Sequence, residues 1–233
     1  MAIVLVDHSV FLHVPKTGGK WVAQVLDRCG LVRRRITRPN KHIDARAVLA
    51  LLRQRRRLPD LCRRLVGRPP APRPFVFCFV RHPVSWYESW FKYMSQPERN
   101  WRPWSRDPYG RVWHPCAALD GLGSHDFNTF VRNVIRHRPG YVTEMYRLYD
   151  QPGVDFIGKQ ETLCDDLIAV LRRLGLDFDE KAIRGYRPVG VSPTPPRPVQ
   201  WDPELLAEIE RLEYASLVRY GYRSWLDQAQ HAA

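Results

Sequence analysis

Apolar and polar positions along the chain follow two periods that predict alternating strands and helices. Residues 9–14 and 75–80 (FVFCFV) are short apolar runs of the kind found in strands buried inside a sheet. Each run is followed by apolar residues at helical spacing, at 20–29 and 84–94. The same two periods predict a further strand at 154–158 and further helices at 44–58, 126–137, 141–149, 161–174, 179–185 and 203–219.

This alternation favours an α/β fold built around a mostly parallel sheet. The 233 residues suffice for one core, and we expect a single domain over residues 1–233. An irregular excursion rich in Trp, Pro, Arg and Gly interrupts the domain at about 97–124. The Arg- and Pro-rich segment 53–73 is expected to be a surface connection with room for a short helix at 60–66.

Charge and cysteine content indicate the kind of partner and the cellular compartment to expect. Lys and Arg number 37 against 24 Asp and Glu, a net charge of +13, so we expect an anionic partner. The five cysteines are odd in number and widely spaced, which argues against a disulfide framework or zinc site and fits the cytoplasm. The apolar N-terminus lacks a basic region and a cleavage site, and no run of 18 apolar residues occurs. We therefore expect neither a signal peptide nor a membrane span.

A glycine-containing loop at 13–21 (HVPKTGGKW) follows the first strand and opens the first helix. Glycines at such a turn let the backbone approach an anion, and the N–H groups at the helix start face it. Lys16 and Lys20 add positive charge. A Walker A loop would need glycine at Val14 and Ser or Thr at Trp21, so a P-loop kinase is disfavoured.

A second motif follows the apolar strand at 75–80. The strand ends in Arg81, Pro83 comes next, and Ser89 lies eight residues after the arginine in the following helix. An arginine at a strand end can bind a phosphate through its forked donors, and a serine two helical turns later can donate its hydroxyl. Structural roles, helix capping for the arginine and packing for the serine, are the alternative for each residue alone.

The two motifs together resemble those of sulfotransferases that use 3′-phosphoadenosine 5′-phosphosulfate (PAPS). PKTGG at 15–19 is similar to the family's 5′-phosphosulfate loop, written PKxGGT or PKSGTTW. VRHP at 80–83 with Ser89 is similar to its 3′-phosphate motif VRxPxxxxxS. Segments 156–174 and 204–222 resemble a strand–Gly–x–x–Glu–helix segment near the adenine and the C-terminal helix of the bacterial and carbohydrate branch. The resemblance therefore covers most of the chain.

The resemblance implies a three-layer α/β sandwich related to nucleotide kinases, with a P-loop-like site. It implies transfer of the sulfuryl group of PAPS to a hydroxyl of a carbohydrate or small-molecule acceptor, without a metal. The residues it places at the cofactor are Lys16, Thr17, Gly18, Gly19, Lys20, Trp21, Arg81 and Ser89. Lys20 departs from the family, which has Ser or Thr there, and Trp21 is either an adenine contact or ordinary helix packing.

Catalysis needs a cation at the leaving phosphate and a base for the acceptor proton. The resemblance gives Lys16 the first role. A neutral imidazole suits the second, so we expect His42, just before the second helix, to be the base. Asp44 is the alternative base, although it also fits an N-cap of that helix. His82 directly follows Arg81 and is not expected to be the base.

Other interpretations of the sequence remain open. The arginines at 53–64 could serve a nucleic-acid-binding module, but no such signature is visible, and we expect neither nucleic acid nor a membrane span as partner. A P-loop kinase and a PAPS-binding protein without catalysis are further alternatives. No His and carboxylate cluster has metal-ligand spacing, and His114 with Cys116 is too isolated. The aromatic residues expected either to line the acceptor or to form a satellite cluster are Trp101, Trp104, Tyr109 and Trp113.

Overall fold

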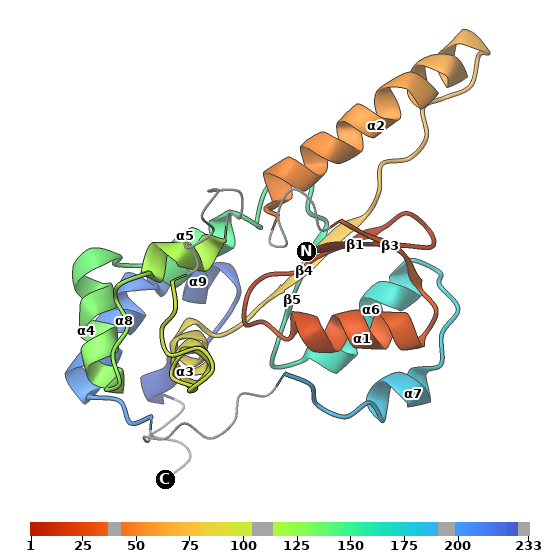
Figure 1. Cartoon of the computed structure of the whole chain (residues 1–233). Coiled ribbons are helices and arrows are strands. Elements are labelled where there is room, and N and C mark those ends of the chain that lie inside the picture. Colours follow the sequence, from red (N-terminus) through yellow and green to blue (C-terminus); the bar gives the residue numbers. More distant parts are fainter. Residues whose placement is uncertain (37–42, 104–113, 191–198, 228–233) are drawn as a thin grey trace.

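The computed structural model describes residues 1–36, 43–103, 114–190 and 199–227 (Figure 1). A five-stranded sheet lies at the centre, in the order β3-β1-β2-β4-β5. The strands are β1 (Ala2–Leu5), β2 (Val10–Leu12), β3 (Val32–Ile36), β4 (Val76–Val80) and β5 (Phe156–Lys159). The predicted α/β class is confirmed. The sheet is mixed: β2–β4 and β4–β5 are parallel, as predicted, whereas β1 is antiparallel to both β2 and β3.

The apolar N-terminus forms two strands because a tight turn splits it. His8 has a φ of 74°, and the carboxylate of Asp7 accepts hydrogen bonds from the Ser9 backbone N–H at 3.0 Å and hydroxyl at 2.7 Å. These contacts reverse the chain and pair β1 with β2. β3 was not predicted: its three central residues are exposed arginines, so it has no apolar pattern. Charged side chains of this kind also protect an edge strand from pairing with another chain.

The two faces of the sheet carry separate apolar clusters because strand side chains alternate. One face, with Ile3, Phe11 and Phe77, is covered by α1 (Gly19–Arg28), α6 (Leu163–Arg173) and α7 (Glu180–Arg184). The other face, with Val10 and Val76, packs against a second group of helices (Figure 1). This group comprises α3 (Pro83–Met94), the short 3-10 helix η1 (Pro115–Leu119), α4 (Phe127–His137), α5 (Tyr141–Arg147), α8 (Pro203–Leu212) and α9 (Tyr214–Arg219).

Several helices start where the sequence predicted, each of them capped by an aspartate. Asp126, Asp179 and Asp202 accept hydrogen bonds from the first turns of α4, α7 and α8, at 2.8, 3.1 and 3.0 Å. The predicted helix at 203–219 is divided into α8 and α9 at Glu213, whose carboxylate is buried among α3 and α5.

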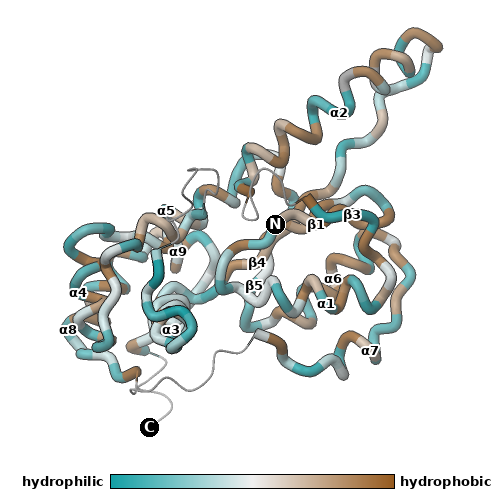
Figure 2. Tube along the Cα trace, in the orientation of Figure 1, coloured by the Kyte–Doolittle hydropathy of each residue, from teal (hydrophilic) through white to brown (hydrophobic). Residues whose placement is uncertain are grey.

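Helix α2 (Ala45–Leu65) is longer than predicted and extends away from the rest of the fold (Figure 1). It continues past Pro59, so the prediction of a surface connection beginning at Arg53 is wrong up to Leu65. Hydrophobic and hydrophilic residues alternate along it to its outer end (Figure 2). In the described ranges no helix combines the length and the apolar character needed to cross a bilayer.

Candidate functional site

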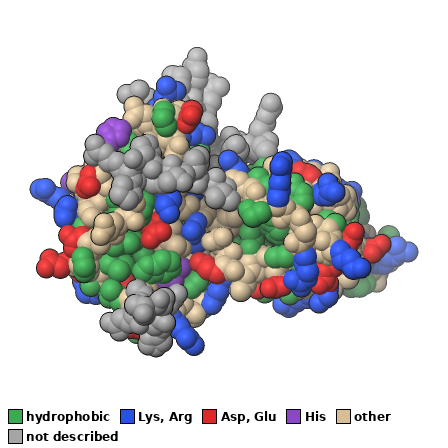
Figure 3. Space-filling model, turned by 90° about the horizontal axis from the view of Figure 1, so that it is seen from below, with side chains coloured by type: hydrophobic (Ala, Val, Ile, Leu, Met, Phe, Trp, Pro, Cys, Tyr) green, Lys and Arg blue, Asp and Glu red, His purple; other side chains and the backbone are tan. Residues whose placement is uncertain are grey.

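Three parallel strands end at one edge of the sheet. β2 leads into α1 on one face, and its neighbour β4 leads into α3 on the other face. Neighbouring strands whose helices leave to opposite faces open a crevice at their carboxyl ends, where α/β proteins bind ligands. Figure 3 shows the molecule from below relative to the view of Figure 1. Lys and Arg side chains are exposed in the middle of the surface seen there as well as at its margins.

The loops that follow these strands are joined by hydrogen bonds. The indole Nε1 of Trp86, on α3, donates to the carbonyl of Pro15 at 2.9 Å. The backbone N–H of His82 donates to Glu161 Oε1 at 2.8 Å. The loop at 13–18, the start of α3 and the loop after β5 are therefore connected to one another.

The two glycines of the first loop are required by close neighbours. Gly18 has a φ of 80°, and a Cβ there would lie 2.5 Å from Leu163 Cδ2. A Cβ on Gly19 would lie 2.1 Å from the ring of His13. A larger residue at either position would require these side chains to move, so the glycine pair lets α1 begin close to His13 and Leu163.

No side chain caps the N-terminus of α1. Its N-cap is Gly18, which has no side chain to offer, and Thr17 is buried with its hydroxyl donating to the Val14 carbonyl at 3.1 Å. Within the described ranges, the N–H groups of Gly18, Gly19 and Lys20 donate no hydrogen bond. Unpaired N–H groups and the positive end of the helix dipole together favour an anion at this point.

Lys16 holds a backbone conformation that favours glycine. Its φ is 65°, and a non-glycine residue in this region usually marks a turn or a functional site. Its ammonium lies 4.2 Å from the centre of the Tyr93 ring, within the range of a cation–π interaction. Burial, followed by the nearby charges of Arg81 and Lys20, lowers the pKa of Lys16 to about 7. The positive potential around Lys16 is therefore high.

Arg81 is the second cation of the site, and its backbone is held firmly. The Tyr146 hydroxyl accepts from the Arg81 N–H at 3.0 Å and donates to its carbonyl at 2.7 Å. The side-chain Nε donates to Ser85 Oγ at 2.8 Å. No carboxylate in the described part of the chain forms an ion pair with it, and burial lowers the pKa of Arg81. Its terminal guanidinium nitrogens remain available for a ligand.

Three polar side chains of α3 lie on one face of the helix. Ser85, Ser89 and Tyr93 are spaced by four residues, and Arg81 lies four residues before Ser85, just ahead of the helix. Ser89 is buried, and no described residue forms a hydrogen bond with its hydroxyl. Arg81 and Ser89 were predicted from the sequence, but Ser85 and Tyr93 were not, although the four-residue spacing through the motif could have indicated both.

Arg99 was also missed. Its guanidinium carbon lies 4.8 Å from the centre of the Tyr93 ring, and its charge contributes to the lowered pKa of Lys16. Arg99 belongs to the irregular excursion at 97–124, where no periodic pattern predicts which side chain turns inward. A third cation therefore reaches the site through the tertiary structure alone.

His82 has a structural position, as expected from its place beside Arg81. Its Nδ1 accepts from the Val84 N–H at 3.2 Å, and its Nε2 lies 3.0 Å from the Arg223 carbonyl. The rings of Tyr222 and Trp225 pack against it at 5.1 and 4.8 Å. Burial lowers the pKa of His82, which favours the neutral imidazole. This ring connects residues 222–225 to the start of α3.

The residues that follow the glycines point in different directions. Lys20 is exposed and its side chain lies against Gly190. Trp21 is buried in the cluster on the α1 face, with its Nε1 3.4 Å from the Tyr186 carbonyl and its ring edge-on to Tyr186. The structure gives Trp21 a packing role, and an adenine contact for it stays a prediction.

The structure places neither predicted base beside Lys16 within the described residues. His42 lies outside them, in the segment 37–42. Asp44 is the N-cap of α2, where its carboxylate accepts from the Ala47 N–H at 2.7 Å. Trp104, Tyr109 and Trp113 also lie outside the described residues. Trp101 packs against Phe91 and Phe130 of the main core, with ring centres 5.9 and 5.1 Å apart, so it belongs to no separate satellite cluster.

The part of the chain that the structure describes brings no three His, Cys, Asp or Glu side chains together as metal ligands.

Comparison with protein-family models, with curated proteins and with solved structures finds no match for this chain. The chemistry of the site must therefore be argued from its own residues.

Proposed function

We propose that this protein is a sulfotransferase that moves the sulfuryl group of PAPS to a hydroxyl of a carbohydrate or small-molecule acceptor, in a three-layer, P-loop-like α/β fold. The observation that carries this proposal is the proximity of Lys16 and Arg81 at the uncapped N-terminus of α1. Two half-buried cations and unpaired N–H groups suit a ligand with two anionic ends, and PAPS has a 5′-phosphosulfate and a 3′-phosphate.

Each end of the ligand has a natural partner. The N–H groups of Gly18, Gly19 and Lys20 would bind the 5′ end together with Lys16. The guanidinium of Arg81 would bind the 3′-phosphate, and Ser89, two turns along α3, would donate its hydroxyl to the same group. Ser85 would keep the guanidinium in place through its bond to Nε.

The reaction follows from this placement. The acceptor oxygen attacks sulfur as the bond to the bridging oxygen breaks, and the electron pair of that bond passes to the 5′-phosphate of the product PAP. The acceptor proton passes to a base, for which His42 is our first candidate and Asp44 the second. The Lys16 ammonium stabilises the charge that grows on the bridging oxygen. Because the bound anions favour the ammonium form, they raise the pKa of Lys16 from about 7 and keep it charged.

Titration calorimetry with PAP tests the proposal without knowledge of the acceptor. The wild type is compared with Arg81→Ala and with Arg136→Ala, an exposed arginine on α4. We expect Arg81→Ala to weaken PAP binding by more than about tenfold, or ~1.4 kcal/mol, and Arg136→Ala to leave it unchanged.

Adenosine 5′-monophosphate, which lacks the 3′-phosphate, makes the test specific to the proposed contact. The wild type should prefer PAP over this nucleotide, and Arg81→Ala should lose the preference. A wild type that binds no PAP, or that binds ATP with magnesium more tightly, would contradict the proposal. Binding of PAP without sulfate transfer from PAPS in a broad acceptor screen would favour a PAPS-binding protein without catalysis.

A further inference from the structure

The outer part of α2 forms an arm with the chain that returns beside it. The side chain of Arg56 donates to the Ala71 carbonyl, and Arg63 Nε donates to the Pro69 carbonyl at 2.8 Å. At the base of the arm, Arg73 pairs with Asp155 and donates to the Gly153 carbonyl at 3.2 Å. These contacts hold a groove of about 580 Å³ between the helix and the returning chain.

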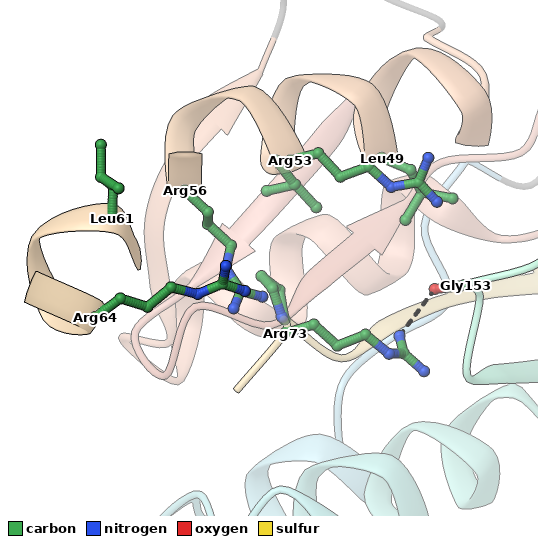
Figure 4. Close-up of a pocket in the computed structure, with 9 residues that line it drawn as sticks. Leu49, Arg53, Arg56, Leu61, Arg64, Arg73 and Gly153 are labelled. Carbon is green, nitrogen blue, oxygen red and sulfur yellow. Dashed lines mark hydrogen bonds between the residues drawn. The ribbon is translucent and has the colours of Figure 1, made fainter. Parts of the chain in front are cut away.

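Arginines and leucines of the arm lie at different angles around α2. Figure 4 shows Arg56 and Arg64 extending from α2 toward Arg73, whereas Leu61 points the other way. At 100° per residue, Leu58, Leu61 and Leu65 fall within about 60° of the helix circumference. They therefore form one apolar stripe, which starts at the rim of the groove because Leu61 also lines it. Arg55 and Arg64 lie about 60° beyond its two edges.

This stripe is exposed to an unusual degree. Leu58, Leu61, Leu65 and Val66 are 73%, 52%, 77% and 68% exposed. They are four of the seven large hydrophobic side chains that are exposed in the described ranges. Because Figure 1 shows the arm extending from the body, a broad flat surface can reach the stripe without meeting the rest of the fold.

The stripe lies in strongly basic surroundings. Residues 53–68 contain seven arginines and one aspartate, a net charge of +6. Arg55, Arg64 and Arg68 are exposed, and no described residue forms an ion pair or hydrogen bond with their side chains. An apolar stripe flanked by arginines matches the boundary between acyl chains and anionic headgroups.

We infer that the α2 arm binds the surface of a bilayer that contains anionic phospholipid. Leu58, Leu61 and Leu65 enter the headgroup boundary, and the flanking arginines contact the phosphates. A nucleic acid fits less well, because residues 44–74 contain no aromatic side chain for base stacking and the leucines would face a polar partner. The inference does not depend on the proposed sulfotransferase activity.

Vesicle flotation of the full chain tests the inference. The vesicles are made of phosphatidylcholine with or without phosphatidylserine. We expect binding only with phosphatidylserine, and weaker binding as salt is raised. The double variant Arg64→Ala/Arg68→Ala should bind about thirtyfold more weakly, since each arginine near an anionic surface contributes roughly fivefold. The variant Leu58→Ser/Leu65→Ser should lose more than about tenfold.

Matched controls alter the same residue types elsewhere. Tyr214→Ser/Val218→Ser changes two exposed apolar side chains on α9, and Arg136→Ala/Arg138→Ala changes two exposed arginines at the C-terminal end of α4. Both should bind vesicles as the wild type does. All the altered side chains are exposed, so thermal unfolding should be unchanged and a loss of binding should not reflect misfolding.

Three results would overturn the inference. The first is no binding to phosphatidylserine vesicles at low salt. The second is binding that the leucine substitutions leave intact and that a double-stranded oligonucleotide displaces, which would make the arm a nucleic-acid site. The third is self-association that disappears on leucine substitution without vesicle binding, which would make a second copy of this chain the partner.

Discussion

Replacing Lys16 with methionine should stabilise the fold and at the same time remove the affinity for PAP. In the unfolded chain the amine has its ordinary pKa of 10.5, whereas burial and neighbouring cations lower the pKa of Lys16 to about 7 in the fold. Between these two values the unfolded state binds more protons than the native state. The stability of the wild type therefore rises with pH in this window, and the full cost of the buried lysine is present below about pH 7.

The magnitude follows from the pKa difference. At 1.36 kcal/mol per pH unit, a fall from 10.5 to about 7 corresponds to about 4 to 5 kcal/mol of destabilisation in acidic and neutral solution. Methionine keeps most of the aliphatic stem and its contact with the Tyr93 ring without the charge. We expect Lys16→Met to raise the free energy of unfolding by at least about 2 kcal/mol at pH 7, and this gain to shrink by about 2 kcal/mol at pH 9.

Urea denaturation of the wild type and Lys16→Met at both pH values measures this effect. Lys181→Met, an exposed lysine on α7, is the matched control and should change stability by less than about 0.5 kcal/mol. A Lys16→Met protein that is less stable than the wild type would show that the ammonium of Lys16 does not destabilise the fold. A gain in stability that does not depend on pH would show the same.

Calorimetry of PAP binding completes the test. At pH 8 most of Lys16 is neutral in the free protein, so binding of an anion should draw a proton onto it. The binding enthalpy should then differ between two buffers of different ionisation enthalpy, and Lys16→Met should abolish the difference along with most of the affinity. Equal enthalpies in both buffers for the wild type would show that Lys16 does not take up a proton from solution.

Two further predictions concern the scaffold of the site. The buried carboxylate of Glu213 accepts from the Tyr87 hydroxyl at 2.6 Å and from the Thr143 N–H and hydroxyl at 2.7 and 2.6 Å. Glu213→Gln should therefore cost about 3 kcal/mol in urea denaturation, because its amide cannot accept from every donor. Glu208→Gln, which loses only a surface ion pair with Arg211, should cost less than about 0.5 kcal/mol. Asp44→Ala should cost about 1 kcal/mol through the lost cap on α2 and Asp44→Asn only a few tenths, and equal losses would contradict the capping role.

The candidate site was predictable where a local pattern encodes it. Lys16, Gly18 and Gly19 were predicted because a loop between a strand and a helix has a recognisable motif in consecutive residues. Arg81 was predicted because it ends an apolar run. Ser85 and Tyr93 were missed even though their spacing from Arg81 is also local. Arg99 could not be found, because it enters the site from an irregular segment.

By itself the sequence determined the positions of most helices, the buried strand β4 and the glycine loop. Apolar periodicity, aspartate caps and glycine turns act between residues close together in the chain, so they can be interpreted without the fold. Only the tertiary structure decided the antiparallel edge of the sheet, the reach of α2 past Pro59 and the electrostatics of the site. Strand partners and buried charges depend on residues far apart in sequence, and the pKa of Lys16 follows from burial and from Arg81 and Arg99 on two other segments, besides Lys20 in its own loop.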